Sequence, residues 1–317
     1  MRLIPEYEPV GKLYLSFVHS FFNTRFGYGR TICEMAEAAS PGVNVEVSVG
    51  AADQEWWQAE VARNLPGHVR IATNPDSPNR GTVTEYVPIW AMTDGGRGVG
   101  LVFRQPHLGD RDALRQFAER FARNVGATPL DIGFDFTTAG LVVNEEVVLL
   151  SSHWFQGEAS AASYGWFTSS FPQQSFYVVP SLAGDVTNDL DMCLWPIAPR
   201  AWIASEYPEG CPQAESMRPA LQILREHGHT VHRVPGLEPI VYDDINTMPN
   251  YANGVLLNRT ALVPIYGRTE DDVVIGILRD YGFEVCPIDC RQIILSNSGL
   301  HCISKTVPRT VLQPPDS

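Results

Sequence analysis

One order of secondary-structure elements repeats along this chain, and the repeat limits the folds that the sequence can adopt. The clearest copy has an apolar hairpin over Gly254–Pro264, an amphipathic helix from Thr269 to Tyr281, and a strand over Phe283–Ile288. Apolar residues recur at helical spacing in the middle segment, and Gly282 follows it as a typical helix stop. The pattern predicts a β-β-α-β unit.

Four other parts of the chain follow the same plan, some of them loosely. Their hairpins, helices and strands are expected at Met192–Ile203, Ala214–Glu226 and His229–Val234; at Gly98–Phe103, Asp112–Asn124 and Thr128–Phe134; at Lys12–His19, Thr31–Ala39 and Val43–Val49; and at Val142–Leu150 and Phe176–Val179, where the helix is poorly marked. One such unit cannot bury its own apolar face, so the five should pack against one another. We predict a single α/β domain over residues 1–317; an ordinary α/β domain with coincidental repetition is the alternative.

The composition narrows the class of protein. The formal net charge of −13 argues against a nucleic-acid surface, which needs basic patches. No apolar stretch approaches the roughly 20 residues that cross a bilayer, and no secretory signal is visible, so we expect a soluble cytoplasmic protein. The six cysteines fit a reducing compartment, and Cys286 and Cys290 lack a second ligand pair, so we predict no metal and no other cofactor. Lysine occurs only as Lys12 and Lys305.

The segment Ser296–Cys302 is a candidate catalytic loop. It consists mostly of small and polar residues and ends in the adjacent pair His301 and Cys302. Such a loop can turn sharply and leave a thiol accessible, and a thiolate is an effective nucleophile. The alternative is a buried, inert cysteine, which is common in protein cores.

Two carboxylates two residues apart form a second candidate. Asp189 and Asp191 precede an apolar hairpin. In an extended strand they would lie on one face, where two neighbouring carboxylates cannot ionise equally well, so one pKa should be raised. Such a pair suits one acid and one anionic holder of a cation, whereas a solvated acidic turn is the alternative. A glycine-rich turn over Trp90–Arg97 attracts notice as well, although a plain hairpin explains it.

Three segments resemble bacterial agmatine deiminases and bacterial peptidylarginine deiminases. The opening Leu3–Pro9 is similar to the start of the agmatine enzymes, Tyr251–Asn258 followed by Leu262–Pro264 is similar to both groups, and Gly299–Cys302 resembles their terminal Gly-x-His-Cys signature. The similarity runs through nearly the whole chain in matching order. It implies the pentein fold, a five-bladed α/β propeller with pseudo-five-fold symmetry, in agreement with the five units counted above.

The resemblance also implies a chemistry. A cysteine thiolate attacks the central carbon of a guanidinium, carboxylates hold the guanidinium nitrogens, and a histidine moves protons; a planar cation with several N–H donors is well matched by paired carboxylates. Carried over by motif, the catalytic residues are Cys302, Asp189 and Asp191. The expected substrate-binding residues are Asp94, Asp131, Asn253, His301 and Trp90.

Two positions depart from the family pattern. Where the family carries His-x-Asp, this chain has Asp189-Leu190-Asp191, so an aspartate replaces the expected acid–base histidine. Where the family carries Trp-x-Arg-Asp, Trp90 is followed by Ala91, Met92 and Thr93, so the arginine is lost and the aspartate is displaced to Asp94.

The sequence therefore predicts a cysteine-dependent deiminase that acts on a guanidino compound or an arginyl peptide through a covalent intermediate on Cys302. Its expected partner is a cationic small molecule or peptide, with neither nucleic acid nor membrane, and homo-oligomers are possible. The alternatives are an amidinotransferase, a specialised biosynthetic enzyme with altered chemistry, and a binding protein that has kept the fold and lost turnover.

Overall fold

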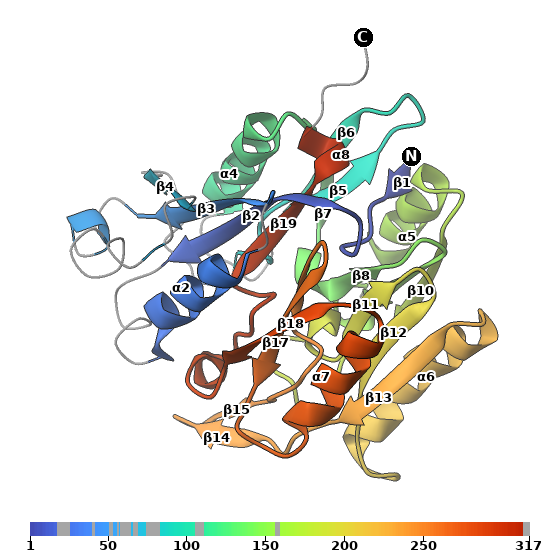
Figure 1. The fold of residues 1–317 in the computed structure, drawn as a ribbon. Helices are drawn as coiled ribbons and strands as arrows, with labels where there is room; N and C mark the ends of the chain where they lie inside the picture. The colour runs from blue at the N-terminus through green and yellow to red at the C-terminus, as the bar shows by residue number, and fades with distance from the viewer. Residues whose placement is uncertain are drawn as a thin grey trace.

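The computed structural model describes residues 1–17, 26–39, 42–50, 53–55, 57, 65, 69–73, 83–104, 111–155 and 159–312. Residues 18 and 19, at the end of the predicted strand Lys12–His19, lie outside this set. Most described strands form five sheets of three or four strands, and Figure 1 shows helices placed between them. None of the described helices is long and apolar enough to span a membrane.

The five sheets share one topology. In each, the first strand pairs antiparallel with the second, and the second pairs parallel with the third. A parallel pair needs a crossover, which a helix provides in every sheet. The sheets, each with its helix, are β5 (Ile89–Met92), β6 (Gly98–Arg104), α4 (Arg111–Asn124) and β7 (Thr128–Asp135); β8 (Leu141–Val143), β9 (Val147–Ser151), α5 (Ala159–Ser170) and β10 (Ser175–Val179); β11 (Leu194–Ala198), β12 (Ala201–Glu206), α6 (Pro212–Glu226) and β13 (Thr230–Pro235); β16 (Val255–Leu257), β17 (Thr260–Ile265), α7 (Asp271–Asp280) and β18 (Glu284–Asp289); and β19 (Ser304–Pro308), β2 (Val10–Phe17), α2 (Tyr28–Ala38) and β3 (Asn44–Val49).

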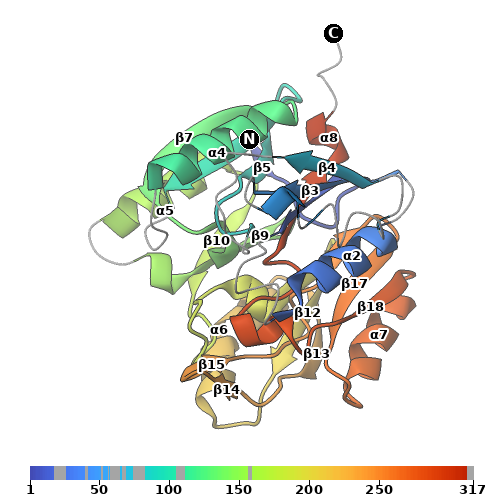
Figure 2. The same cartoon turned by 90° about the vertical axis from the view of Figure 1, so that its left-hand side faces the viewer.

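The remaining elements extend these sheets or connect them. β1 (Arg2–Leu3) pairs with β5, and β4 (Val69–Thr73) pairs with β3. A separate hairpin joins β14 (Ile240–Tyr242) to β15 (Ile245–Thr247). Short helices are η3 (Thr138–Gly140), η4 (Ser152–Trp154), η5 (Leu190–Met192), η6 (Ile293–Ser296) and the C-terminal α8 (Arg309–Leu312). In the turned view, α4, α5 and α7 lie on the outside of the strands (Figure 2).

The repeated β-β-α-β order is confirmed, with two corrections. Gly98–Phe103 was expected to supply a hairpin, but it lies in the single strand β6, and its antiparallel partner is the preceding strand β5. The Lys12–His19 segment was expected to supply a hairpin, but it provides the single strand β2, and the missing antiparallel partner is β19 from the far end of the chain. Ser304 aligns with Leu15, and Figure 1 shows the two strands side by side. This pairing holds the loop before β19, which carries Cys302, against the first unit.

Alternating side chains place the core between sheets and helices. In β3, Val45, Val47 and Val49 are almost fully buried and Asn44 is exposed, while the polar Ser48 is buried as well. The largest apolar cluster joins β2, β3, α2, α7 and the strands of the β11–β13 and β16–β18 sheets, and it includes Cys302 and Ile303. The loop carrying the candidate nucleophile is therefore fixed by core packing.

Candidate active site

The loop before β19 is shaped by two special backbone positions. Asn297, which ends η6, has a positive φ of 56°, and Gly299 follows in a crowded position. A Cβ atom on residue 299 would lie 2.2 Å from Oδ1 of Asn253, far inside any tolerated contact. The glycine of the Gly-x-His-Cys signature is thus required by the close approach of the Asn253 side chain.

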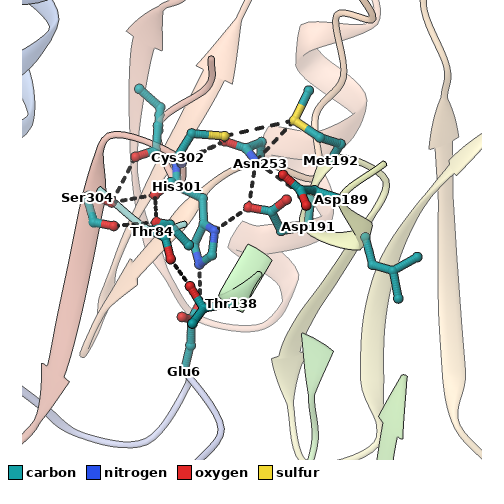
Figure 3. Close-up of polar contacts among 12 residues, drawn as sticks. Glu6, Thr84, Thr138, Asp189, Asp191, Met192, Asn253, His301, Cys302 and Ser304 are labelled. Carbon is teal, nitrogen blue, oxygen red and sulfur yellow. Dashed lines mark hydrogen bonds and ion pairs between the residues drawn. The ribbon is translucent and has the colours of Figure 1, made fainter. Parts of the chain in front are cut away.

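Asn253 is the hydrogen-bonding hub of the site. Its Oδ1 accepts from the backbone N–H of His301 at 3.0 Å and from that of Cys302 at 3.3 Å. Its Nδ2 donates to Oδ2 of Asp191 and to the backbone oxygen of Asp191, each at 3.3 Å. The side chain is only 1% exposed, so these contacts are made away from water. Asn253 therefore ties the cysteine loop to the aspartate segment (Figure 3).

The imidazole of His301 lies between two carboxylates. Its Nδ1 is 2.6 Å from Oδ2 of Asp191, and its Nε2 is 2.6 Å from Oε2 of Glu6 (Figure 3). Burial alone would lower the pKa of His301, but the charge of Glu6 and the hydrogen bond to Asp191 outweigh it and raise the pKa to about 10. At neutral pH the imidazole is therefore a cation that donates to both carboxylates.

Glu6 completes this charge cluster with the help of a lysine. Nζ of Lys305 lies 3.5 Å from Oε1 of Glu6. Burial alone would raise the pKa of Glu6, but the charges of His301 and Lys305 outweigh it and lower the pKa to about 2. The contacts therefore run in series from Asp191 to His301, Glu6 and Lys305, and they join two acidic and two basic side chains in one cluster. Their formal charges cancel.

Asp189 lies beside Asp191, although not in the predicted way. The segment is not an extended strand, because Asp189 precedes the short helix η5, which contains Asp191. Both side chains are 5% exposed, and the Oδ1 atoms of both are buried without a hydrogen-bond partner among the described residues. Burial and then the charge of Asp191 raise the pKa of the Asp189 carboxyl well above its ordinary value, as expected for one member of a pair. The protonated form of Asp189 is favoured.

The Cys302 thiol is enclosed near these groups. Its side chain is 5% exposed, and Sγ lies 3.6 Å from Oδ1 of Asn253 and 4.0 Å from Sδ of Met192. Burial and then the charge of Asp191 raise the pKa of the thiol well above its ordinary value, with Asp189 contributing in the same direction. In the structure without substrate, Cys302 is therefore a neutral thiol at neutral pH.

The backbone around Cys302 is held by two threonines. The N–H of Thr84 donates to the carbonyl of Cys302 at 3.1 Å, and its hydroxyl donates to the carbonyl of Ser304 at 2.6 Å. The hydroxyl of Thr138 in turn donates to the carbonyl of Thr84 (Figure 3). Thr84 thus fixes the loop directly and Thr138 holds Thr84 in place, which leaves the thiol little freedom of position.

A cavity opens next to the charge cluster. Its wall contains Asp191, His301, Glu6 and Lys305, and most of the rest is apolar; among the described residues that line it, Cys302 is not included. Trp90 also lines it, with its Nε1 donating to the carbonyl of Thr306 at 2.8 Å. Trp90 therefore acts as a fixed apolar wall.

The structure does not bring two of the predicted substrate-binding residues to this site. Asp94 lies in the turn after β5, is 94% exposed, and pairs with the N-terminal ammonium at 3.4 Å. Asp131 lies on β7, is 38% exposed, and pairs with Arg115 at 3.4 Å. Both carboxylates project into solvent, and Asp94 is also displaced by one residue from the family pattern that assigned it. The other predicted residues gather around the cavity or the thiol: Cys302, Asp189, Asp191, Asn253, His301 and Trp90.

Three members of the site had no predicted role. Glu6 belongs to the opening motif, Met192 follows the aspartate pair, and Lys305 is one of only two lysines. The scarcity of lysine and the position of Lys305 three residues after Cys302 were available signals. The contact between Glu6 and His301, which spans 295 positions, has no local signal.

Comparisons with known proteins show which family and which folds this chain is similar to. Residues 173–308, which include both aspartates, Asn253 and the cysteine loop, match the family model of the Porphyromonas-type peptidyl-arginine deiminases. The predicted family resemblance is confirmed. No curated protein sequence matches the chain.

Solved deiminase structures share the fold over nearly the whole chain. An agmatine deiminase from C. jejuni, with a cysteine replaced by serine and substrate bound, has a TM-score of 0.82 at 17% identity, covering 97% of this chain and 96% of its own. A putative arginine deiminase from Porphyromonas gingivalis has a TM-score of 0.74 at 18% identity, covering 98% and 99%. An amidinotransferase from Microseira wollei is more distant, with a TM-score of 0.53 at 11% identity, covering 99% of both chains. The chain therefore has the mixed α/β fold of agmatine deiminases and amidinotransferases.

Proposed function

We propose that this protein is a cysteine-dependent hydrolase that removes ammonia from a guanidino compound. The observation that carries the proposal is the convergence of Cys302, Asp189 and Asp191 around the Asn253 hub, next to a cavity with an apolar wall. The fold shared with agmatine deiminases supports it. We propose further that the five β-β-α-β units are the blades of a closed propeller with the site near its axis.

Asp191 and Asp189 can take different roles in this reaction, one as a hydrogen-bond acceptor and the other as a proton donor. Oδ1 of Asp191 is buried and free of a hydrogen bond among the described residues, so it can accept an N–H of a planar guanidinium. Asp189 is held in its protonated form, so it can donate a proton to a leaving nitrogen. In this proposal Asp189 replaces the family histidine as the acid.

The proposed reaction balances in two steps. The sulfur of Cys302 bonds to the central guanidinium carbon and gives up its proton; one C–N bond breaks and ammonia leaves with that proton, relayed through the carboxyl of Asp189. A cationic amidino-thioether on Cys302 remains. Water then adds to the same carbon and the C–S bond breaks. One water proton returns to the sulfur, the other is released to solvent, where ammonia takes it up, and a neutral ureido product leaves. A bound guanidinium next to the thiol favours the thiolate and offsets the effect of burial on its pKa.

A binding protein without turnover is the second candidate. Cys302 does not line the cavity among the described residues, and its thiol pKa is raised rather than lowered. Both observations are typical of an inert cysteine. The two candidates differ in whether any ligand makes the thiol react.

Ammonia release tests the proposal. Wild type, Cys302→Ala and Cys193→Ala are compared over arginine, agmatine and arginyl peptides; Cys193 is a second buried cysteine, in a different apolar cluster, and serves as the matched control. We expect release by wild type and Cys193→Ala and none by Cys302→Ala. Equal release by all three proteins would exclude Cys302.

A haloacetamidine probe separates the remaining possibilities. A stoichiometric adduct on Cys302 without ammonia, together with transfer of the amidino group to added ornithine, would assign an amidinotransferase. Absence of both adduct and ammonia would assign the binding protein.

A further inference from the structure

Lys305 is a buried cation in the wall of the cavity, with little to bind. Its side chain is 6% exposed, and within the described part of the chain the polar partner of its Nζ is Oε1 of Glu6, at 3.5 Å. An ammonium has three N–H donors, so two are left without an acceptor among the described residues. Buried charges of this kind are costly unless they are paired and hydrogen-bonded.

The net charge of the cavity wall around Lys305 does not favour a substrate that carries a second cationic group besides the guanidinium. Glu6 and Asp191 each contact His301, and Glu6 also contacts Lys305. The four formal charges cancel, so the wall offers no surplus negative charge to a second cationic group. Beyond the cluster, the wall is made largely of apolar side chains such as Ile4, Ile89 and Trp90. These apolar side chains can pack against the hydrocarbon part of a substrate.

We propose that the substrate of this site is a guanidino compound with a carboxylate at its other end, and that Lys305 binds this carboxylate. The proposal rests on the proposed function for the guanidino end. Cys302 and Lys305 are three residues apart, so their Cα atoms are at most roughly 10 Å from each other, and both side chains can contact one small substrate.

A pair of ligands that differ in the distal group tests the proposal. 4-Guanidinobutyrate carries a carboxylate where agmatine carries an ammonium, and binding of each is measured by calorimetry on the Cys302→Ser protein, which has no nucleophilic thiol. We expect the acid to bind at least tenfold more tightly than the amine. Tighter binding of agmatine, or no binding of the acid, would overturn the proposal.

Variants at the only two lysines make the test specific. Lys305→Gln should weaken binding of the acid by roughly 10- to 100-fold, the range for a hydrogen bond to a charged group, and leave the amine unchanged or tighter. Lys12→Gln, which removes the other lysine and its pair with Glu46, should change neither. Equal weakening of both ligands by Lys305→Gln would assign Lys305 a structural role. Should Lys305→Gln fail to fold, Lys305→Arg, which keeps the charge, must retain the preference for the acid.

Turnover separates this proposal from the proposed function. If 4-guanidinobutyrate binds through Lys305 but wild type releases no ammonia from it, the carboxylate subsite is supported and the proposed hydrolase function is refuted. Ammonia released from agmatine in preference to the acid would sustain the hydrolase and refute the subsite.

Discussion

Replacement of Asn253 by alanine tests the central claim that this side chain holds the cysteine loop. Oδ1 of Asn253 is the acceptor for the backbone N–H groups of His301 and Cys302, at 3.0 and 3.3 Å. The N–H of His301 also donates to the backbone carbonyl of residue 253 at 3.3 Å, which the alanine variant keeps. Of these two groups only the N–H of Cys302 is left without an acceptor among the described residues, at a cost of about 1–3 kcal/mol, and Asn253→Ala should lower the free energy of unfolding by that amount. Urea denaturation with an unchanged m-value measures this loss.

The same variant should change the chemistry of the thiol, because the loop that positions Cys302 is released. We expect iodoacetamide to alkylate Cys302 faster in Asn253→Ala than in wild type, as read by mass spectrometry of the peptide. Asn144→Ala is the control: Asn144 is equally buried and hydrogen-bonded, but to Ala198 and Glu145. It should cost stability without changing alkylation of Cys302. A loss below about 1 kcal/mol in Asn253→Ala, or equal alkylation rates, would refute the role of Asn253 as the hub.

Three further predictions concern the charged groups. Asp189→Asn keeps the shape of a carboxyl that is already neutral, so stability should change by less than about 1 kcal/mol while ammonia release falls by about 10²–10⁴-fold; a large loss of stability would show that Asp189 is ionised. Alkylation of Cys302 in the absence of ligand should be slow near pH 7 and still be rising at pH 9, because burial raises the pKa of the thiol; a plateau below pH 8 would contradict this. Glu6→Gln should lower the free energy of unfolding by about 1.5–3 kcal/mol at pH 6, measured by urea denaturation. The contribution of Glu6, whose pKa is about 2 instead of 4.5, is complete above pH 4.5 and is lost as the pH falls toward 2; that of His301, whose pKa is about 10 instead of 6.5, is complete below pH 6.5 and is lost as the pH rises through 10. The deficit of Glu6→Gln should therefore be largest between pH 4.5 and 6.5 and shrink above pH 10, and a deficit that grows with pH would contradict the pairing.

Local sequence pattern predicted the units of this fold but not how its ends meet. Hairpins, helices and glycine stops are set by short-range periodicity, which is why the unit of β16, β17, α7 and β18 was predicted nearly residue by residue. The pairing of β19 with β2 joins Ser304 to Leu15, and no local pattern specifies a partner at such a separation. The hairpin expected at the N-terminus was wrong for this reason.

The candidate site shows the same division. The Gly299–Cys302 signature could be recognised in the sequence because its glycine is sterically required. The Asn253 side chain lies against the loop and leaves no room for a Cβ atom at residue 299. Asp94 and Asp131 were assigned only by their likeness to family motifs that this chain has altered. At Asp94 the motif is displaced by one residue, and such a shift moves a side chain away from the face where it is expected. Glu6 was missed because its partner His301 comes from the other end of the chain.

The protonation states in this cluster decide which residue can replace the missing histidine. His301 is adjacent to the nucleophile and has a titratable ring, but two carboxylates raise its pKa to about 10, so it does not readily give up its proton near neutral pH. Glu6, with a pKa of about 2, does not take one up. Asp189 differs, because burial and the charge of Asp191 bring its pKa upward from the acidic range, and a general acid is most effective when its pKa lies near the working pH. The pairing with Glu6 and Asp191 thus removes His301 from acid–base chemistry, whereas the charge of Asp191 helps to keep the proton on Asp189, the replacement residue.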